Sequence, residues 1–125
     1  MELFNILDAL NVKKAIATSS FEEFVKKVLE ELGIADRFDE VITSDQVKES
    51  KPDPAIYLEA ARKLRVLPEN CLVVEDAENG VNAGYNAQMK VIAVPHEHSS
   101  THDFHNAANI LDSLEQIDKN LILSY

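Results

Sequence analysis

The stretch CLVVEDA, residues 71–77, joins a short apolar run to two adjacent carboxylates, Glu75 and Asp76. An apolar run that ends abruptly at polar residues is typical of a buried strand, more often parallel than antiparallel. The two carboxylates would then lie at the strand's carboxyl end, the edge at which open α/β sheets bind ligands. Adjacent carboxylates repel each other unless a proton or a cation neutralises one of them. The stretch therefore predicts a site for a hard cation such as Mg²⁺ or, with equal weight, an ordinary solvated strand end.

Helical and strand patterns alternate on both sides of this stretch. Apolar residues recur at helical spacing in some segments, and short apolar runs bounded by turn residues separate them. The pattern predicts helices over 2–11, 21–32, 54–64 and 79–85, and strands over 14–18, 39–43, 71–75 and 89–94. We also expect Ser20 and Glu23 to form a capping box at the second helix. Because the crossovers are long enough for parallel pairing, the fold class is α/β with a parallel sheet of about four strands.

The composition favours one acidic domain over residues 1–125. The chain has 46% hydrophobic residues and a formal net charge of −10, so we expect a real core and no nucleic-acid partner, because no basic stripe is available to bind phosphates. No apolar run reaches the roughly 18 residues of a membrane span, and no signal peptide opens the chain. We therefore expect a cytoplasmic protein without a membrane partner. Cys71, the single cysteine, is expected to be a small buried core residue.

Polar residues with complementary chemistry follow three successive strands. Thr18 and Ser19 follow the first, Lys51 lies in the loop after the second, and Glu75 and Asp76 end the third. Hydroxyl and backbone N–H groups bind phosphate oxygens at a helix N-terminus, a lysine adds a point positive charge, and a carboxylate pair suits a metal that screens phosphate. Each signal alone is weak, since a Ser-Ser pair before a helix is more often only a cap. Their joint order along the strands is much more specific.

Three runs resemble motifs of a known family. AIATSS (15–20), SKPDPAIY (50–57) and LVVEDAENGV (72–81) are similar to the second, third and fourth motifs of the haloacid dehalogenase (HAD) superfamily hydrolases, and most closely to β-phosphoglucomutase-like phosphatases. The resemblance covers about residues 3–118 and implies a three-layer α/β/α Rossmann-like core that acts on small phosphorylated metabolites.

The resemblance also assigns roles to individual residues. It implies that Thr18 binds phosphate, that Lys51 contacts phosphate and nucleophile as a catalytic residue, and that Asp76, assisted by Glu75, binds Mg²⁺. It further implies that Gly80 allows the turn after the metal loop. Two carboxylates are few ligands for Mg²⁺, so millimolar affinity at best is expected.

The chain departs from the family where the covalent step is made. Family members begin with a central strand that ends in Asp-x-Asp, the first Asp being the nucleophile, and a helical cap follows; residues 1–125 contain neither. We therefore expect a truncated core without phosphatase turnover, whose missing segment is supplied by another polypeptide or lost. Self-association is a further option. The alternative is a non-catalytic binding module that keeps the fold. A receiver-like signalling domain fits less well, because a receiver needs its acids before the hydroxyl and the lysine.

The missing strand also raises the question of how the sheet closes. In the family the nucleophile strand lies between the strands that match 14–18 and 71–75. Unpaired buried backbone groups cost about 1–3 kcal/mol each, and helix 2–11 has the wrong periodicity to fill the slot. Three outcomes are open: 14–18 pairs directly with 71–75, a segment such as one from a neighbouring copy fills the slot, or the chain needs a missing partner to fold. We favour direct pairing of 14–18 with 71–75.

The histidines of the loop after residue 95 suggest a second metal reading. His96, His98, His102 and His105 fall within ten residues and could bind zinc. Histidines on a polar loop are more often solvated, no cysteine is near, and a specific zinc site is the less favoured interpretation.

Overall fold

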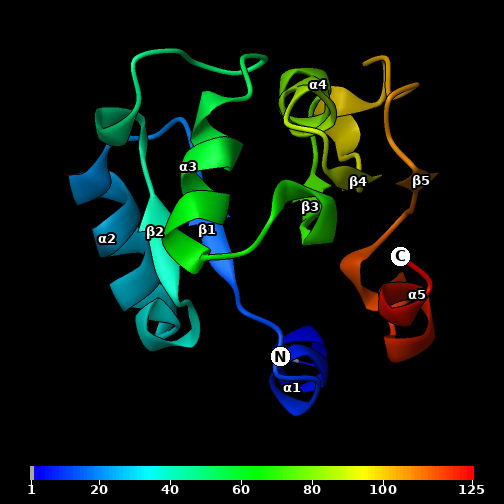
Figure 1. Ribbon diagram of the computed structural model, residues 1–125, viewed down its shortest axis with the longest axis horizontal. Helices are drawn as coiled ribbons and strands as arrows, with labels where there is room; N and C mark the ends of the chain where they lie inside the picture. Colours follow the sequence, from blue (N-terminus) through cyan, green and yellow to red (C-terminus); the bar gives the residue numbers. More distant parts are fainter. Residues whose placement is uncertain (1) are drawn as a thin grey trace.

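A computed structural model describes residues 2–125, and each predicted helix and strand is present within one or two residues of its expected bounds (Figure 1). The helices are α1 (Glu2–Ala9), α2 (Glu22–Leu32), α3 (Ala55–Leu64), α4 (Glu78–Asn86) and α5 (Lys119–Leu123). The strands are β1 (Ala15–Ala17), β2 (Glu40–Ile42), β3 (Leu72–Glu75), β4 (Lys90–Ala93) and β5 (Asn109–Ile110). The α/β class and the parallel pairing are confirmed.

The strands form two parallel sheets rather than one. β1 pairs with β2, with Ile16 opposite Val41, and β4 pairs with β3 and β5, with Val91 opposite Val73. Over residues 2–125 no ladder joins β1 to β3, so the prediction that 14–18 pairs with 71–75 is wrong. Figure 1 shows the two sheets side by side, with α2 and α3 beside β1 and β2, and α4 beside β3 and β4.

The helix layer explains why the two edges do not close. α3 contacts β1 and β2, α4 contacts β3 and β4, and the two helices also contact each other. Packed helices need about 8–10 Å between their axes, whereas paired strands lie about 4.8 Å apart. Two strands that each lie under one of two adjacent helices are therefore held about two strand spacings apart. The packed core cluster, which includes Ile56 and Ala60 of α3 and Val81 of α4, offsets the unpaired edges.

Backbone conformation and capping fix the helix ends. Asn11 (φ 56°) and Gly33 (φ 70°) take the left-handed conformation after α1 and α2, a conformation that ends a helix. The predicted capping box is wrong. Phe21 occupies the N-cap position of α2 without a side-chain acceptor, and the Ser20 N–H instead donates to Thr18 Oγ1 at 3.2 Å. A local turn at the end of β1 thus takes the place of the cap.

The core lies under α3 and α4, and β4 is its best-buried strand. Val91, Ile92 and Ala93 are at most 1% exposed, whereas Val74 on β3 is 42% exposed. Cys71 is only half-buried and its Sγ–H lies 3.5 Å from the Leu67 carbonyl, so it is not the core residue that we predicted. Burial still raises the pKa of its thiol.

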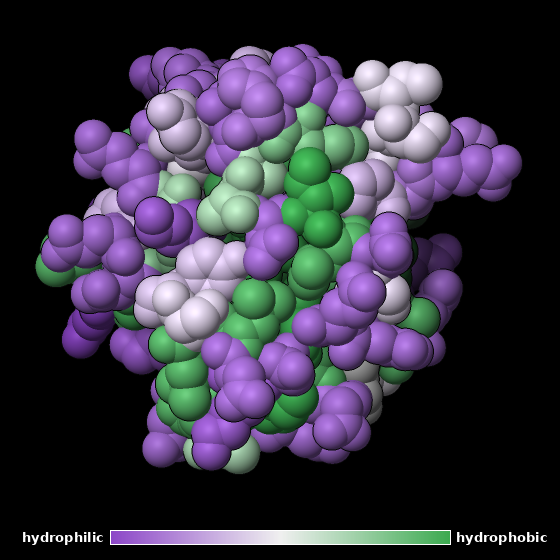
Figure 2. Space-filling view, turned by 90° about the vertical axis from the view of Figure 1, so that its right-hand side faces the viewer, coloured by the Kyte–Doolittle hydropathy of each residue, from purple (hydrophilic) through white to green (hydrophobic). Residues whose placement is uncertain are grey.

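Part of the apolar content counted in the sequence lies on the surface. Figure 2 shows an apolar band between hydrophilic areas on the side of the molecule that carries β5 and α5. The C-terminal segment contributes exposed apolar side chains, among them Ile110, Leu114 and Leu123. No helix of the described chain, residues 2–125, is long and apolar enough to cross a membrane.

Candidate functional site

Lys51 is the group that joins the carboxyl ends of the two sheets. Its ammonium donates to the Ala17 carbonyl at 3.2 Å and to Glu75 Oε2 at 2.5 Å. The Lys51 and Glu75 side chains are 14% and 10% exposed, so the ion pair is largely withdrawn from water. One cation therefore contacts the last residue of β1 and the last residue of β3. The sequence placed Lys51 and Glu75 in two of the three strand-end loops, and the direct contact between them is a finding of the structure.

Glu75 has a second partner that the sequence reasoning missed. Tyr57, on the first turn of α3, donates its hydroxyl to the same Oε2. The Tyr57 ring is buried, and burial together with the neighbouring Glu75 charge raises the pKa of its phenol. The available signal was the position of Tyr57, six residues after Lys51 and at the start of a helix whose N-terminus lies at the same edge. Glu75 Oε2 thus accepts from two side-chain donors.

Asp76 lies apart from this cluster and faces solvent. Its side chain is 60% exposed, and its Oδ2 lies 3.3 Å from His96 Nε2. His96 Nδ1 accepts a hydrogen bond from the His98 N–H, so the proton on the His96 ring is assigned to Nε2, which faces Asp76. His96 was considered in the sequence only as a zinc ligand. Its place beside the carboxylate comes from the loop after β4 and carries no local sequence signal.

The hydroxyls after β1 are used locally. Thr18 is half-buried and its Oγ1 accepts from the Ser20 N–H, while its own N–H donates to the Ile42 carbonyl at 3.0 Å. Ser19 is exposed. The turn leaves the Thr18 and Ser19 side chains at the carboxyl end of β1, directly after the Ala17 carbonyl that Lys51 contacts. Whether either hydroxyl binds phosphate stays a prediction.

Gly80 makes room for the Glu75 carboxylate. A Cβ at this position would stand 2.0 Å from Glu75 Cδ and 2.1–2.2 Å from its two carboxylate oxygens. Gly80 lies inside α4, with no left-handed backbone conformation to favour glycine. Its role is therefore close approach by a side chain, and the predicted role in a turn after the metal loop is corrected.

The loop histidines have structural partners. Within residues 2–125 no group of three or more His, Cys, Asp or Glu side chains is arranged to hold a metal ion. His102 Nδ1 accepts from the Glu78 N–H at 3.1 Å, at the first residue of α4, and Glu78 Oε1 accepts from the Asp103 N–H at 2.9 Å. His105 Nδ1 lies 2.9 Å from Asp103 Oδ1. These contacts dock the loop on α4, and the described structure offers no zinc centre there.

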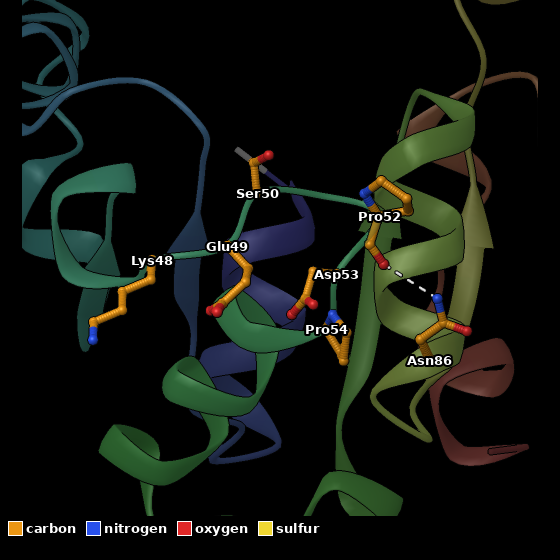
Figure 3. Close-up of a pocket in the computed structure, with 7 residues that line it drawn as sticks. All are labelled: Lys48, Glu49, Ser50, Pro52, Asp53, Pro54 and Asn86. Carbon is orange, nitrogen blue, oxygen red and sulfur yellow. Dashed lines mark hydrogen bonds between the residues drawn. The ribbon is translucent and has the colours of Figure 1, made fainter.

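An open cavity of about 650 Å³ lies beside the Lys51 loop. Figure 3 shows the residues that line it, among them Asn86 at the end of α4, whose side-chain amide donates to the Pro52 carbonyl at 3.2 Å. The lining residues carry mixed charge: Lys48, Glu49, Ser50, Pro52, Asp53, Pro54 and Asn86. None of the predicted site residues is among them. The bond from Asn86 fixes the loop that carries Lys51 to the β3–β4 half of the molecule.

The donor set at the strand ends fits Mg²⁺ in kind but not in number. Glu75 and Asp76 supply carboxylate oxygens, the ligands that this cation prefers. Glu75 Oε2, however, already accepts from Lys51 and Tyr57, which leaves Asp76 as the accessible carboxylate. The residues present would hold the ion weakly, through Asp76 first.

Comparison with known proteins places these features in a family. A sequence model of the haloacid dehalogenase-like hydrolases matches residues 1–88. The chain is 36% identical over 121 residues to YhcW of Bacillus subtilis, which covers 97% of this chain and 55% of that protein. It is 36% identical over 91 residues to a phosphorylated carbohydrates phosphatase of Thermotoga maritima, which covers 73% of this chain and 42% of that protein.

The solved structures agree with the fold. The β-phosphoglucomutase of Clostridium difficile superposes with a TM-score of 0.85 at 30% identity, over 98% of this chain and 52% of that chain. The 125 residues therefore span about half the length of the relatives that they match. The residues that the family model matches, 1–88, include Lys51, Glu75 and Asp76.

Proposed function

Because the chain belongs to the haloacid dehalogenase-like hydrolases, we propose that it forms the phosphate- and metal-binding part of a phosphatase-type active site. One observation carries the proposal: the Lys51 ammonium contacts the Ala17 carbonyl and the Glu75 carboxylate, and so brings the ends of two separate sheets to one point. A fixed, largely desolvated cation at the carboxyl ends of parallel strands is suited to an anionic ligand.

Each predicted residue has a role in this proposal. Thr18 and Ser19 donate hydrogen bonds to phosphate oxygens, and Lys51 neutralises the phosphate charge as it leaves water. Asp76, with Glu75 assisting, would hold Mg²⁺, and the bound ion would screen the phosphate charge. The substrate class is a small phosphate ester. The Thermotoga maritima relative, named a phosphorylated carbohydrates phosphatase, supports a phosphorylated carbohydrate.

The nucleophile must come from outside these 125 residues, because they contain no Asp-x-Asp. No ladder joins β1 to β3 in residues 2–125, and in the family a strand that carries the nucleophile lies between the strands that match them, so we propose that a complementing segment or a second copy of the chain docks there. Positioning and charge without a nucleophile leave out the covalent step. The 125 residues alone are then a binding-competent but inactive half-site.

A turnover assay is the first test. The purified 125-residue chain is mixed with p-nitrophenyl phosphate and with small sugar phosphates in the presence of Mg²⁺, and no turnover is expected. Metal-dependent turnover that disappears in Asp76→Ala would contradict the proposal, because it would place a nucleophile within these residues. Size-exclusion chromatography of the same sample reports whether a second copy associates.

A binding titration tests the half-site itself. Inorganic phosphate is titrated into the chain with Mg²⁺ present and followed by NMR. We expect millimolar affinity that falls at least about tenfold in Lys51→Met, since a charged hydrogen bond contributes about 1.5–3 kcal/mol. Lys48→Met is the matched control, because Lys48 is an exposed lysine of the same loop. Equal affinities in the two variants would remove Lys51 from the site.

Mg²⁺ binding distinguishes the proposed half-site from the alternative of a non-catalytic binding module. Calorimetry of Mg²⁺ binding should give millimolar affinity that is lost in Asp76→Ala if the carboxylate end of β3 is a metal site. A chain that binds neither Mg²⁺ nor phosphate, while keeping its fold, would instead favour an interaction module. The occupation of Glu75 by two side-chain donors is the observation that favours this alternative.

A further inference from the structure

We propose that Tyr57 is a positioning residue, whose hydroxyl holds the Glu75 carboxylate against Lys51 and so fixes the lysine ammonium at the strand ends. The inference rests on the proposed role of Lys51 in phosphate binding and adds a residue on which that role depends.

The position of Tyr57 leaves its hydroxyl few other partners. The residue is 7% exposed, lies on the first turn of α3 and packs in the core cluster with Ile56 and Val81. The helix is set in place at its first residue, where the Ala55 N–H donates to Asp53 Oδ1 at 2.9 Å. A buried phenol needs a hydrogen-bond partner, and the partner here is Glu75 Oε2.

Lys51 is held by the same two residues. Its ammonium donates to Glu75 Oε2 and lies 5.0 Å from the centroid of the Tyr57 ring. A cation at this distance from an aromatic ring is attracted to it. Tyr57 therefore acts on Lys51 twice, through its ring directly and through its hydroxyl by way of Glu75. The Ala17 carbonyl is the third contact of the ammonium.

Glu75 is confined on its other side by α4. The carboxylate fills the space that a Cβ at Gly80 would need, and its second oxygen, Oε1, lies 3.3 Å from the Asp76 N–H. It is thus clamped between the Tyr57 hydroxyl and the Gly80 backbone. Without the Tyr57 hydroxyl, the Glu75 carboxylate loses one of its three hydrogen-bond donors. Rotation of the Glu75 side chain toward the open strand end then becomes easier.

The contacts of Tyr57 predict a change in ligand binding that destabilisation of the fold alone would not produce. If Tyr57 holds Glu75 on Lys51, removing the hydroxyl loosens the lysine but releases a carboxylate toward Asp76. Phosphate affinity should then fall while Mg²⁺ affinity stays the same or rises. A variant that merely loosened the fold would weaken both.

The test compares Tyr57→Phe with Tyr85→Phe in the full 125-residue chain. Tyr85 is 54% exposed, so the control makes the same chemical change on the surface. The Lys51 ammonium is followed by ¹H–¹⁵N NMR, and inorganic phosphate and Mg²⁺ are titrated separately. In the wild type and in Tyr85→Phe we expect a resolved Lys51 signal, because the ammonium is held and shielded. In Tyr57→Phe the signal should broaden to that of exposed Lys48, and phosphate affinity should fall about three- to tenfold.

Several outcomes would overturn the inference. They are an unchanged Lys51 signal in Tyr57→Phe, a wild-type signal already as broad as that of Lys48, or a parallel loss of both affinities. If the wild type binds no phosphate, the proposed function fails, while the lysine signal still decides the positioning role. If Tyr57→Phe does not fold, Gly80→Ala displaces the same carboxylate from α4, and an unchanged Lys51 signal there contradicts the clamp.

Discussion

Strands β4 and β1, one from each half of the molecule, differ sharply in burial. In the β3–β4–β5 sheet, Ile92 of β4 is 0% exposed, and its strand is paired on both sides. In the β1–β2 sheet, Ile16 holds the equivalent central position of β1 but is only half-buried, and its strand is paired on one side. The two isoleucines have the same side chain and the same parallel setting. The lower burial of Ile16 accompanies the unpaired edge that β1 presents toward β3.

This comparison shows how the molecule holds together without one continuous sheet. The right half in Figure 1 is built like an ordinary core, whereas the left half is attached to it through α3, through the core cluster and through Lys51 at the strand ends. Polar contacts that cross the gap, such as Asn86 to the Pro52 carbonyl, supplement the helix packing. The candidate site therefore lies at the junction of the better- and the less-buried half.

The largest expected effect is the loss of stability on truncation of Ile92 or Ile16, and it tests the difference in burial between β4 and β1. Ile92→Ala should lower the free energy of unfolding by about 2–5 kcal/mol, because a fully buried side chain leaves a cavity. Ile16→Ala should cost less than half as much, since water already reaches part of its surface. Urea unfolding followed by circular dichroism measures both. Equal losses would mean that β1 is packed as well as β4.

The sequence was sufficient to predict the helices and strands and to place the site residues in the loops that follow the strands. Apolar runs and helical spacing placed all eight predicted segments, and the same pattern put Lys51 and Glu75 in loops that follow successive strands. These features are local, or depend only on strand direction. The direct contact between Lys51 and Glu75 was not predicted and comes from the structure. The pairing of 14–18 with 71–75 is not a local feature. We predicted it from the cost of unpaired backbone groups, which takes no account of the width of the two helices that cover the strands.

The missed residues share a different cause. Tyr57, His96 and His102 act through contacts with groups 18 to 24 positions away in the chain. No spacing rule relates such residues, and each looks ordinary in sequence. Gly80 was noticed, but its role depends on where the Glu75 carboxylate lies, which only the fold decides.

A smaller effect is expected at the helix N-termini of the two halves. α4 is capped by His102 from a distant loop, whereas α2 has Phe21 at the N-cap without a side-chain acceptor. His102→Ala should therefore cost about 1 kcal/mol, and Phe21→Ser should gain a similar amount, because Phe21 is 71% exposed and already in the extended conformation of a cap.

Urea unfolding of the two capping variants measures both changes. His102→Asn is the control, since an amide oxygen supplies an acceptor and should restore part of the stability. Hydrogen exchange at the Glu78 amide reports the cap directly and should quicken in His102→Ala. A His102→Ala protein with unchanged exchange at this amide would show that the loop does not cap α4.

The smallest effect concerns two exposed carboxylates, one in each half. Lys14, and then Arg37, lower the pKa of Asp8, whereas the His105 N–H, and then its ring, lower the pKa of Asp103. The ordinary value is 3.8, so both groups should titrate below it in a ¹³C NMR titration. Because a depressed pKa favours the folded state only while the group is ionised, each contribution is present above about pH 4 and lost as the pH falls through the folded value.

Salt distinguishes the causes of the two pKa shifts. Near 1 M ionic strength the screening length is about 3 Å, which weakens the ion pairs of Asp8 more than the backbone hydrogen bond of Asp103. The pKa of Asp8 should therefore return further toward 3.8 than that of Asp103, and equal shifts would mean that His105 acts on Asp103 through its charge instead.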